Sequence, residues 1–266
     1  MDIKQVLAAL ETFAPLPLQE SYDNAGLQIG LTGEQDVTGA LLCLDITLDV
    51  VDEAIRSGFN LIVSHHPLLF HGLKRIAADG TSVERIVMKA IRNNIAIISM
   101  HTNLDNALGG VNHKMAEKLG LENVRFLQPL NRAGVEGGSG VIGEISAKAL
   151  GVPVIEHIKA VFKAPCAQCS MPAAKENSSD KLKIALCGGG GSFMLSEAKA
   201  QGADIFITGE MHYHEYFEAL GDIQIVVLGH YETEQYTTEL LQEILASSCP
   251  SLPTKLFGST NPIVLI

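Results

Sequence analysis

The stretch LLCLDITLDVVDEAIRSGFNLIVSHHP, residues 41–67, decides the fold class of this chain. Residues 41–46 are a mostly apolar run of strand length, and residues 47–58 carry apolar side chains at helical spacing before a glycine that suits a helix C-cap. Residues 59–64 form a second apolar run of strand length. Apolar strands joined by a helix are typical of a parallel sheet covered on both faces, so the stretch predicts an α/β domain.

The same alternation continues along the chain. Apolar runs predict further strands at 95–100, 141–145, 183–187, 203–208 and 223–229, and amphipathic spacing predicts further helices at 82–94, 111–121, 152–163 and 192–202.

Two parts of the first half recur in the second half. Residues 53–66 align without gaps on 197–210, which places Cys43 on Cys187. Residues 95–105 align on 223–234 with one insertion, which places His101 on His230 and Asp105 on Glu234. Two matches in the same order predict two similar α/β lobes with mainly parallel sheets, rather than a solenoid of short repeats. We place the lobes at 1–128 and 129–266, with a glycine-rich connection at 131–140.

Composition and charge narrow the class of protein. The chain has 266 residues, of which 47% are hydrophobic and 18% charged, which favours a large core over disorder. Its net charge of −11 makes nucleic acid an unlikely partner, because binding to phosphates needs a basic surface. Neither a secretory signal nor a membrane-spanning run of roughly 18 apolar residues is found. Five cysteines, an odd number, suit a reducing compartment, so we expect a cytoplasmic protein.

Three other segments have simple interpretations. The run CGGGGS at 187–192 lacks the lysine of a phosphate-binding loop and is predicted to be a tight strand-to-helix turn. The thiols of Cys166 and Cys169 have no second pair for a zinc knuckle, which leaves a surface dithiol of open role. The polar segment 171–180 is predicted to be an exposed loop.

Histidines and carboxylates gather directly after four predicted strands, where parallel strands bring their carboxyl ends to one edge. These clusters are SHHP at 64–67, MHTNLDN at 100–106, TGEMHYHE at 208–215 and GHYETE at 229–234. Taken singly, each has an ordinary explanation: hydrogen-bonded loop histidines, a capping role for Asp105, or a solvated helix start for His212 and His214. Taken together, they predict a metal site, because imidazole and carboxylate suit Zn, Fe or Mn and so many ionisable groups need a compensating cation.

The chain resembles the NGG-interacting-factor-like proteins, also called type 2 homologues of GTP cyclohydrolase I. Tyr22 stands where the family usually has Trp, and the length fits the compact form without an inserted middle domain. The matching segments are SYDNAGLQIG (21–30), LDIT (44–47), SHHPLLF (64–70), HTNLDNALGGVN (101–112), GADIFITGEMHYHE (202–215), GHYETE (229–234) and STNPI (259–263).

The resemblance implies a dinuclear metal site between the two lobes, with two divalent ions in each chain, and a ring-shaped homohexamer. The ligands it implies, position by position, are His65, His66, Asp105, His230 and Glu234. Glu234 is then expected to bridge the ions, and His101 and Glu210 to orient ligands or to act as general acid or base.

Two hypotheses about function follow. The first is a metal-dependent hydrolase that acts on a small molecule, for example a nucleotide or another heterocycle, with a metal-activated water. The second is a non-catalytic assembly or regulatory protein that its metals stabilise. GTP cyclohydrolase activity is only weakly implied by the family name, and the residues leave the substrate and the physiological metal open.

Overall fold

The computed structural model describes residues 1–30, 35–171, 181–258 and 261–264. The predicted loop at 171–180 therefore lies outside the described residues apart from Met171. The chain forms two compact units. The first unit comprises Met1–Ala107 and Thr237–Thr260, and the second comprises Leu108–Tyr236 and Asn261–Ile266.

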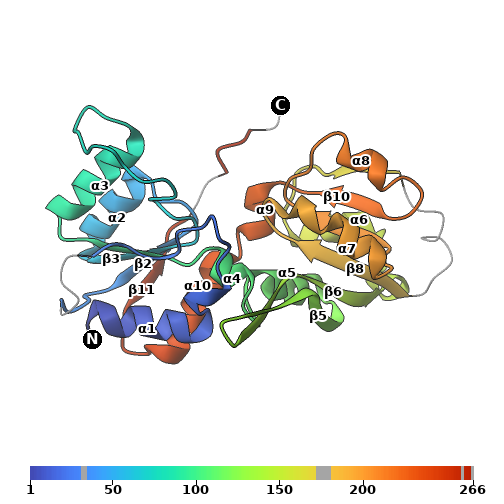
Figure 1. Ribbon diagram of the computed structural model, residues 1–266, viewed down its shortest axis with the longest axis horizontal. Helices are drawn as coiled ribbons and strands as arrows, with labels where there is room; N and C mark the ends of the chain where they lie inside the picture. Colours follow the sequence, from blue (N-terminus) through green and yellow to red (C-terminus); the bar gives the residue numbers. More distant parts are fainter. Residues whose placement is uncertain (31–34, 172–180, 259–260, 265–266) are drawn as a thin grey trace. The chain divides into compact units, whose positions relative to one another are not determined.

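The first unit is a five-stranded sheet with helices on both faces (Figure 1). Its strand order is β1-β4-β3-β2-β11, and all neighbouring pairs are parallel except β1 with β4. Helices α2 and α3 cover one face, and α1 and α10 cover the other. The strands are β1 (Gly26–Ile29), β2 (Ala40–Cys43), β3 (Leu61–Ser64), β4 (Ala96–Ser99) and β11 (Thr254–Leu256). The helices are α1 (Ile3–Phe13), η1 (Leu16–Leu18), α2 (Leu48–Ser57), α3 (Ser82–Arg92), α4 (Thr102–Asp105) and α10 (Thr237–Ser248).

The second unit is a six-stranded sheet in the order β5-β6-β8-β9-β10-β7. One apolar core packs α5 and α6 against the sheet, and another includes residues of α7. The strands are β5 (Glu122–Arg132), β6 (Val135–Ser146), β7 (Gln168–Cys169), β8 (Lys181–Cys187), β9 (Ile205–Thr208) and β10 (Gln224–Val227). The helices are α5 (Val111–Leu119), η2 (Ala147–Leu150), α6 (Val154–Val161), η3 (Gly191–Met194), α7 (Leu195–Ala200), α8 (Glu215–Glu218) and α9 (His230–Glu234).

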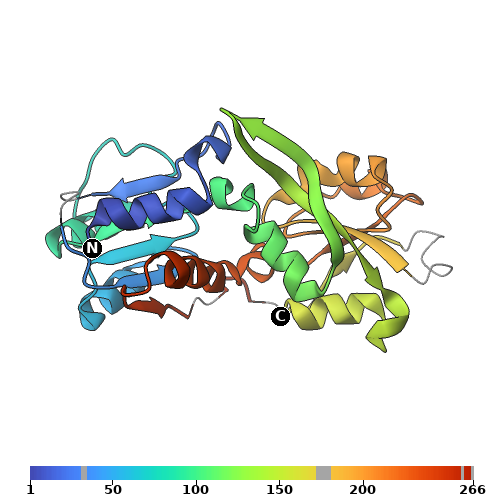
Figure 2. The same cartoon turned by 90° about the horizontal axis from the view of Figure 1, so that it is seen from below.

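The prediction of mainly parallel sheets is right for the first unit and wrong for the second, which is mixed. Only β8, β9 and β10 run parallel there, and β5, β6 and β7 pair antiparallel with their neighbours. Strands β5 and β6 form a long hairpin, which Figure 2 shows in green. A β-hairpin needs only a short turn, so this part of the sheet carries no crossover helix.

The glycine-rich segment 131–140 is part of this hairpin and does not connect two lobes. Ala133 and Gly134 form its tip with φ values of 52° and 81°, the left-handed conformation that a tight hairpin turn requires. Gly138 lies opposite Pro129, and a Cβ there would lie 2.4 Å from the ring of Phe126. The glycines therefore allow close packing between paired strands.

The units are divided differently from the predicted lobes at 1–128 and 129–266. Position 128 falls inside β5, whereas the first part of the first unit ends at Ala107. Residues 237–260 belong to the first unit because β11 pairs in parallel with β2 and α10 packs against α1. Short-range patterning carries no signal for such a return of the chain to an earlier sheet.

The predicted repeat agrees with the registers of the central strands. Cys43 pairs with Ser64 between β2 and β3, and Cys187 pairs with Thr208 between β8 and β9. Each central set is three parallel strands followed by a one-turn helix, α4 in the first unit and α9 in the second. Within the described residues, no helix is both long and apolar enough to span a membrane.

Candidate functional site

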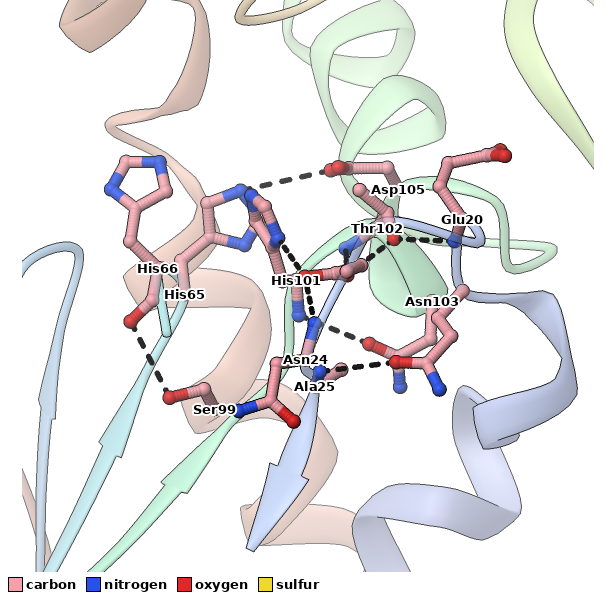
Figure 3. A network of polar contacts seen from close by, with 12 residues as sticks. Glu20, Asn24, Ala25, His65, His66, Ser99, His101, Thr102, Asn103 and Asp105 are labelled. Atoms are coloured by element: carbon pink, nitrogen blue, oxygen red, sulfur yellow. Dashed lines mark hydrogen bonds and ion pairs between the residues drawn. The ribbon is translucent and has the colours of Figure 1, made fainter. Parts of the chain in front are cut away.

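Three histidines lie at the carboxyl ends of β3 and β4 in the first unit (Figure 3). The ring centroids of His65 and His66 are 4.9 Å apart, and that of His101 lies 5.4 Å from His65 and 5.7 Å from His66. Adjacent residues of a strand point to opposite faces, but the backbone leaves the strand at Ser64, so both neighbours reach the same place. The first and second sequence clusters therefore meet within this unit.

His65 is fully buried and is oriented by the main chain. Its Nδ1 lies 2.8 Å from the carbonyl oxygen of Met100, which can only accept, so Nδ1 donates and Nε2 carries the lone pair. Nε2 lies 3.7 Å from Oδ1 of Asp105, beyond hydrogen-bond distance. Two ligands about 2.1 Å from one ion lie roughly 3–4 Å apart, so this separation is compatible with both atoms binding one metal.

His66 and His101 are oriented by carboxylates that follow the same pattern. Nδ1 of His66 lies 2.8 Å from Oδ1 of Asp45, and Nδ1 of His101 lies 2.7 Å from Oδ1 of Asp23. In each pair the carboxylate accepts and the imidazole donates from Nδ1, so Nε2 carries the lone pair of the neutral ring.

Asp23 is the most constrained group of this unit. Its side chain is fully buried, and it accepts hydrogen bonds from His101 and from both the backbone N–H (3.1 Å) and the hydroxyl of Thr102. Burial acts to raise the pKa of Asp23, but the hydrogen bonds from His101 and Thr102 and the charge of His101 outweigh it and hold the pKa below its usual value. Asp23 is therefore ionised at neutral pH and fixes the ring of His101.

The segment after β4 is held by amides that the sequence places beside the candidate ligands. Asn103 donates from Nδ2 to the carbonyl of Ala14 (2.7 Å) and accepts at Oδ1 from the N–H of His101 (3.0 Å). Asn106 donates to the carbonyl of Leu18 (3.0 Å). These contacts dock the turn that carries Asp105 against the segment after α1.

The second unit holds a similar group of its own. His230 opens α9, and its Nδ1 lies 2.8 Å from Oε1 of Glu210, just after β9. Its Nε2 lies 3.0 Å from Oε2 of Glu234, one helical turn later, whose side chain is almost fully buried. Glu210 is thereby placed as a group that orients His230.

Two glycines make room for this second group. A Cβ on Gly189 would lie 2.2 Å from Oε1 of Glu234, and Gly189 has a φ of +55°. A Cβ on Gly209 would lie 2.8 Å from the hydroxyl of Thr233 and 3.0 Å from Cα of His230. The run at 187–192 is therefore a tight turn, as predicted, and its glycines allow α9 to approach the ends of β8 and β9.

One geometry recurs at every histidine of the two groups: Nδ1 donates to a carbonyl or carboxylate oxygen. The four histidines are His65, His66, His101 and His230. Metal-binding histidines nearly always have such a partner, which fixes the tautomer and raises the basicity of the other nitrogen. The residues therefore fit a divalent metal chemically, and His65, His66 and Glu234 are candidate ligands.

Several residues with an open role lie elsewhere. His212 donates from its backbone N–H to Glu215 (2.6 Å), and the ring of His214 packs edge-on against Tyr213. Cys166 and Cys169 are exposed and are not joined in a disulfide.

Sequence reasoning assigned no role to Asp23, Asp45, Gly189 or Gly209. The one sequence signal for Asp23 was its place in the segment SYDNAGLQIG. Its hydrogen-bond partners, His101 and Thr102, lie 78 and 79 positions away along the chain.

This mixed α/β fold with two sheets is that of a known class. The chain belongs to the family described as Duf34/NIF3 (NGG1p interacting factor 3), whose model matches residues 1–262. The resemblance that the sequence motifs indicated is thereby confirmed.

Relatives and solved structures agree over whole chains. The "GTP cyclohydrolase 1 type 2 homolog" of Clostridium acetobutylicum is 34% identical, covering 100% of this chain and 95% of that protein. The protein of the same name from Streptococcus pneumoniae is 30% identical, with 97% of each chain covered. A Bacillus cereus protein related to NIF3 superimposes with a TM-score of 0.84 at 25% identity, covering 100% and 99% of the two chains. Reduced HcgD from Methanocaldococcus jannaschii gives a TM-score of 0.77 at 25% identity, covering 97% and 98%.

Proposed function

We propose that this protein binds two divalent metal ions, Zn, Fe or Mn, and is a metal-dependent hydrolase of a small molecule. The residues that would hold the ions in this proposal are His65, His66, Asp105, His230 and Glu234, and the carboxylate of Glu234 would be shared by the two ions. The observation that carries the proposal is the shared orientation of the histidines, whose Nδ1 atoms all donate to oxygen, so that Nε2 is the nitrogen that would bind a metal.

In the hydrolytic mechanism, the chain's own residues orient groups and move protons. When bound, a pair of divalent ions supplies Lewis acidity and an activated water. Asp23 holds His101 in one tautomer with Nε2 available, so His101 is the residue placed to take or give a proton. Glu210 holds Nδ1 of His230 and is assigned the role of orienting that ligand rather than exchanging protons with substrate.

The substrate in this proposal is a small molecule, with nucleotides and other heterocycles as the first compounds to screen. The name "GTP cyclohydrolase 1 type 2 homolog" belongs to the relatives and motivates including GTP in the screen. It does not single out GTP.

A non-catalytic role for the metals is the alternative. The complete burial of His65 and near-complete burial of Glu234 would suit ions that only stabilise the protein. Both proposals require bound metal, but only the hydrolase requires His101 for turnover. His101→Ala should therefore abolish hydrolysis while the metal content stays unchanged.

The deciding experiment is elemental mass spectrometry of protein purified without chelator, combined with a hydrolysis screen of the metal-loaded protein. We expect about two ions per chain, and fewer than one would contradict the dinuclear proposal. The double variant His65→Ala/Glu234→Ala should lose metal, and full retention would overturn the ligand assignment. The matched control His214→Ala/Glu218→Ala removes an exposed histidine and an exposed glutamate and should keep the ions.

The family resemblance also leads us to propose a ring-shaped homohexamer in the cytoplasm. Sedimentation equilibrium of the metal-loaded protein tests the assembly, and a monomer at micromolar concentration would contradict it.

A further inference from the structure

Exposed aromatic side chains lie beside His101 in the first unit. Tyr22 is 63% exposed and Phe70 is 39% exposed, although both are large and largely apolar. The ring centroid of Phe70 lies 6.1 Å from that of His101, with the ring planes at 85°. Tyr22 lies 6.4 Å from Phe70 on centroids, and the exposed ring of His71 lies 5.0 Å from Phe70. We call Tyr22, Phe70 and His71 the aromatic rim.

Hydrogen bonds hold the two backbone segments of the aromatic rim together. Asn24 donates from Nδ2 to the carbonyl of Leu69 (2.8 Å), and the N–H of Leu69 donates to Oε1 of Gln28 (3.1 Å). Gln28 in turn donates from Nε2 to the carbonyl of Asn24 (2.6 Å). The residue after Tyr22 is Asp23, which His101 and Thr102 fix in place. A ligand that contacts these rings therefore meets a preorganised surface, which lowers the entropic cost of binding.

We propose that Tyr22 and Phe70 bind a planar aromatic heterocycle, of the size of a nucleobase, and hold it beside the imidazole of His101. The inference rests on the proposed function, because it takes this heterocycle to be part of the substrate. Aromatic side chains stack well on flat rings, and every nucleobase offers such a face.

Two features favour a heterocycle over an aliphatic group. The imidazoles of His71 and His101 add hydrogen-bonding nitrogens to an otherwise apolar surface, and ring nitrogens and carbonyls can use them. Phe70 and His101 meet edge to face at a centroid distance of 6.1 Å, which leaves no room for a third ring between them, so a heterocycle stacked on Phe70 would lie at the side of this pair. The bound ring would then lie next to the residue assigned to proton transfer.

Equilibrium binding of guanosine to the full-length protein tests the inference, with ribose as the probe that lacks the base. Titration calorimetry and ligand-observed NMR should detect binding of guanosine but no binding of ribose. Tyr22→Ala and Phe70→Ala should each weaken guanosine binding about five- to hundredfold, as loss of one stacking partner does. Phe70→Tyr keeps a ring and should restore most of the affinity.

Phe193→Ala is the matched control, because Phe193 is 63% exposed in the second unit, far along the chain from the aromatic rim. It should bind guanosine as the unaltered protein does. Equal binding by all variants, or no guanosine binding at millimolar concentration, would overturn the inference. A changed oligomeric state of Phe70→Ala with unchanged guanosine binding would also overturn it, and would assign the rings to a contact between copies of the chain.

The same titration on metal-loaded and chelator-treated protein separates this inference from the proposed function. Protein that binds guanosine through Tyr22 and Phe70 but holds no metal would contradict the hydrolase and leave the aromatic subsite standing. Protein that holds two ions and hydrolyses a non-aromatic compound, without binding guanosine, would support the hydrolase and contradict the aromatic subsite.

Discussion

Asp23 shows how much of the candidate site depends on one buried carboxylate. We predict that Asp23→Asn lowers the free energy of unfolding by about 1–3 kcal/mol, because the amide turns a donor toward groups that themselves donate. Urea unfolding at pH 7 measures the change. Asp36→Asn is the control, since the Asp36 side chain is 91% exposed, and it should change stability by less than about 0.5 kcal/mol. Equal effects of the two substitutions would argue against a special role for Asp23.

A second prediction at the scale of single residues concerns Glu210 and the affinity for metal. Glu210→Gln replaces the carboxylate that accepts from Nδ1 of His230 with a weaker neutral acceptor. Loss of such an orienting carboxylate typically weakens metal binding 10–100-fold, so we expect a decrease of roughly that size. Competition with a chromogenic chelator measures it. Glu218→Gln, at an exposed site nearby in the sequence, should leave the affinity unchanged.

At the scale of elements, the glycines in the turn between β8 and η3 allow α9 to pack closely against that turn. We predict that Gly189→Ala destabilises the protein by about 1–3 kcal/mol, because the new Cβ meets the Glu234 carboxylate and the backbone has a φ of +55°. Gly190→Ala is a close control, since a Cβ there has no neighbour within 4 Å. Thermal unfolding of both variants decides the matter, and a Gly189→Ala protein as stable as the control would refute the packing argument.

Helix α3 provides a pH-dependent prediction. Thr81 and Glu84 form its capping box, in which the N–H of Thr81 donates to the Glu84 carboxylate. That backbone hydrogen bond is the main cause that holds the pKa of Glu84 below its usual value. A lowered folded-state pKa means that Glu84 adds stability above its unfolded pKa and loses this contribution as the pH falls through the folded value.

The melting temperature of Glu84→Gln should therefore lie below that of the unaltered protein at pH 7, and the gap should narrow as the pH falls below about 4. A gap that stays constant across this range would mean that ionisation of Glu84 does not contribute.

At the scale of the whole molecule, the sequence predicts the central parallel strands that recur in both units. It misses most of the strands that pair beside them. The runs that end at Cys43, Ser64, Cys187 and Thr208 are detectable because buried parallel strands are continuously apolar. Of the long β5–β6 hairpin, the sequence predicts a strand at 141–145 alone, because β5 is mostly exposed and the first half of β6 is rich in glycine. The return of β11 is hidden because it is a pairing over some two hundred residues.

The candidate site, too, could be predicted only in part from the sequence. Histidines such as His65 and His230 could be placed because they directly follow recognisable strands. The groups that orient them, such as Asp23 and Asp45, become apparent only in three dimensions, since side-chain hydrogen bonds between distant segments leave no periodic signal.

The accessibility of the five cysteines reports on the packing of each unit. Cys43, Cys187 and Cys249 are buried away from reagents, and burial also raises the pKa of Cys43 and of Cys249, which disfavours their reactive thiolates. Cys166 and Cys169 are exposed. We predict that a water-soluble thiol reagent labels two sites per native chain quickly and all five only after unfolding. Rapid labelling of a third thiol would show that one unit opens locally.

The return of residues 237–260 to the first unit has a consequence for biosynthesis. A ribosome delivers the strands of that sheet in the order β1, β2, β3, β4 and, only after the entire second unit, β11. Until then the nascent chain presents the outer edge of β2 as an unpaired template for other strands. The second unit can complete its own sheet first, so the amino-terminal half of this chain is expected to finish folding last and to depend most on chaperones while it waits.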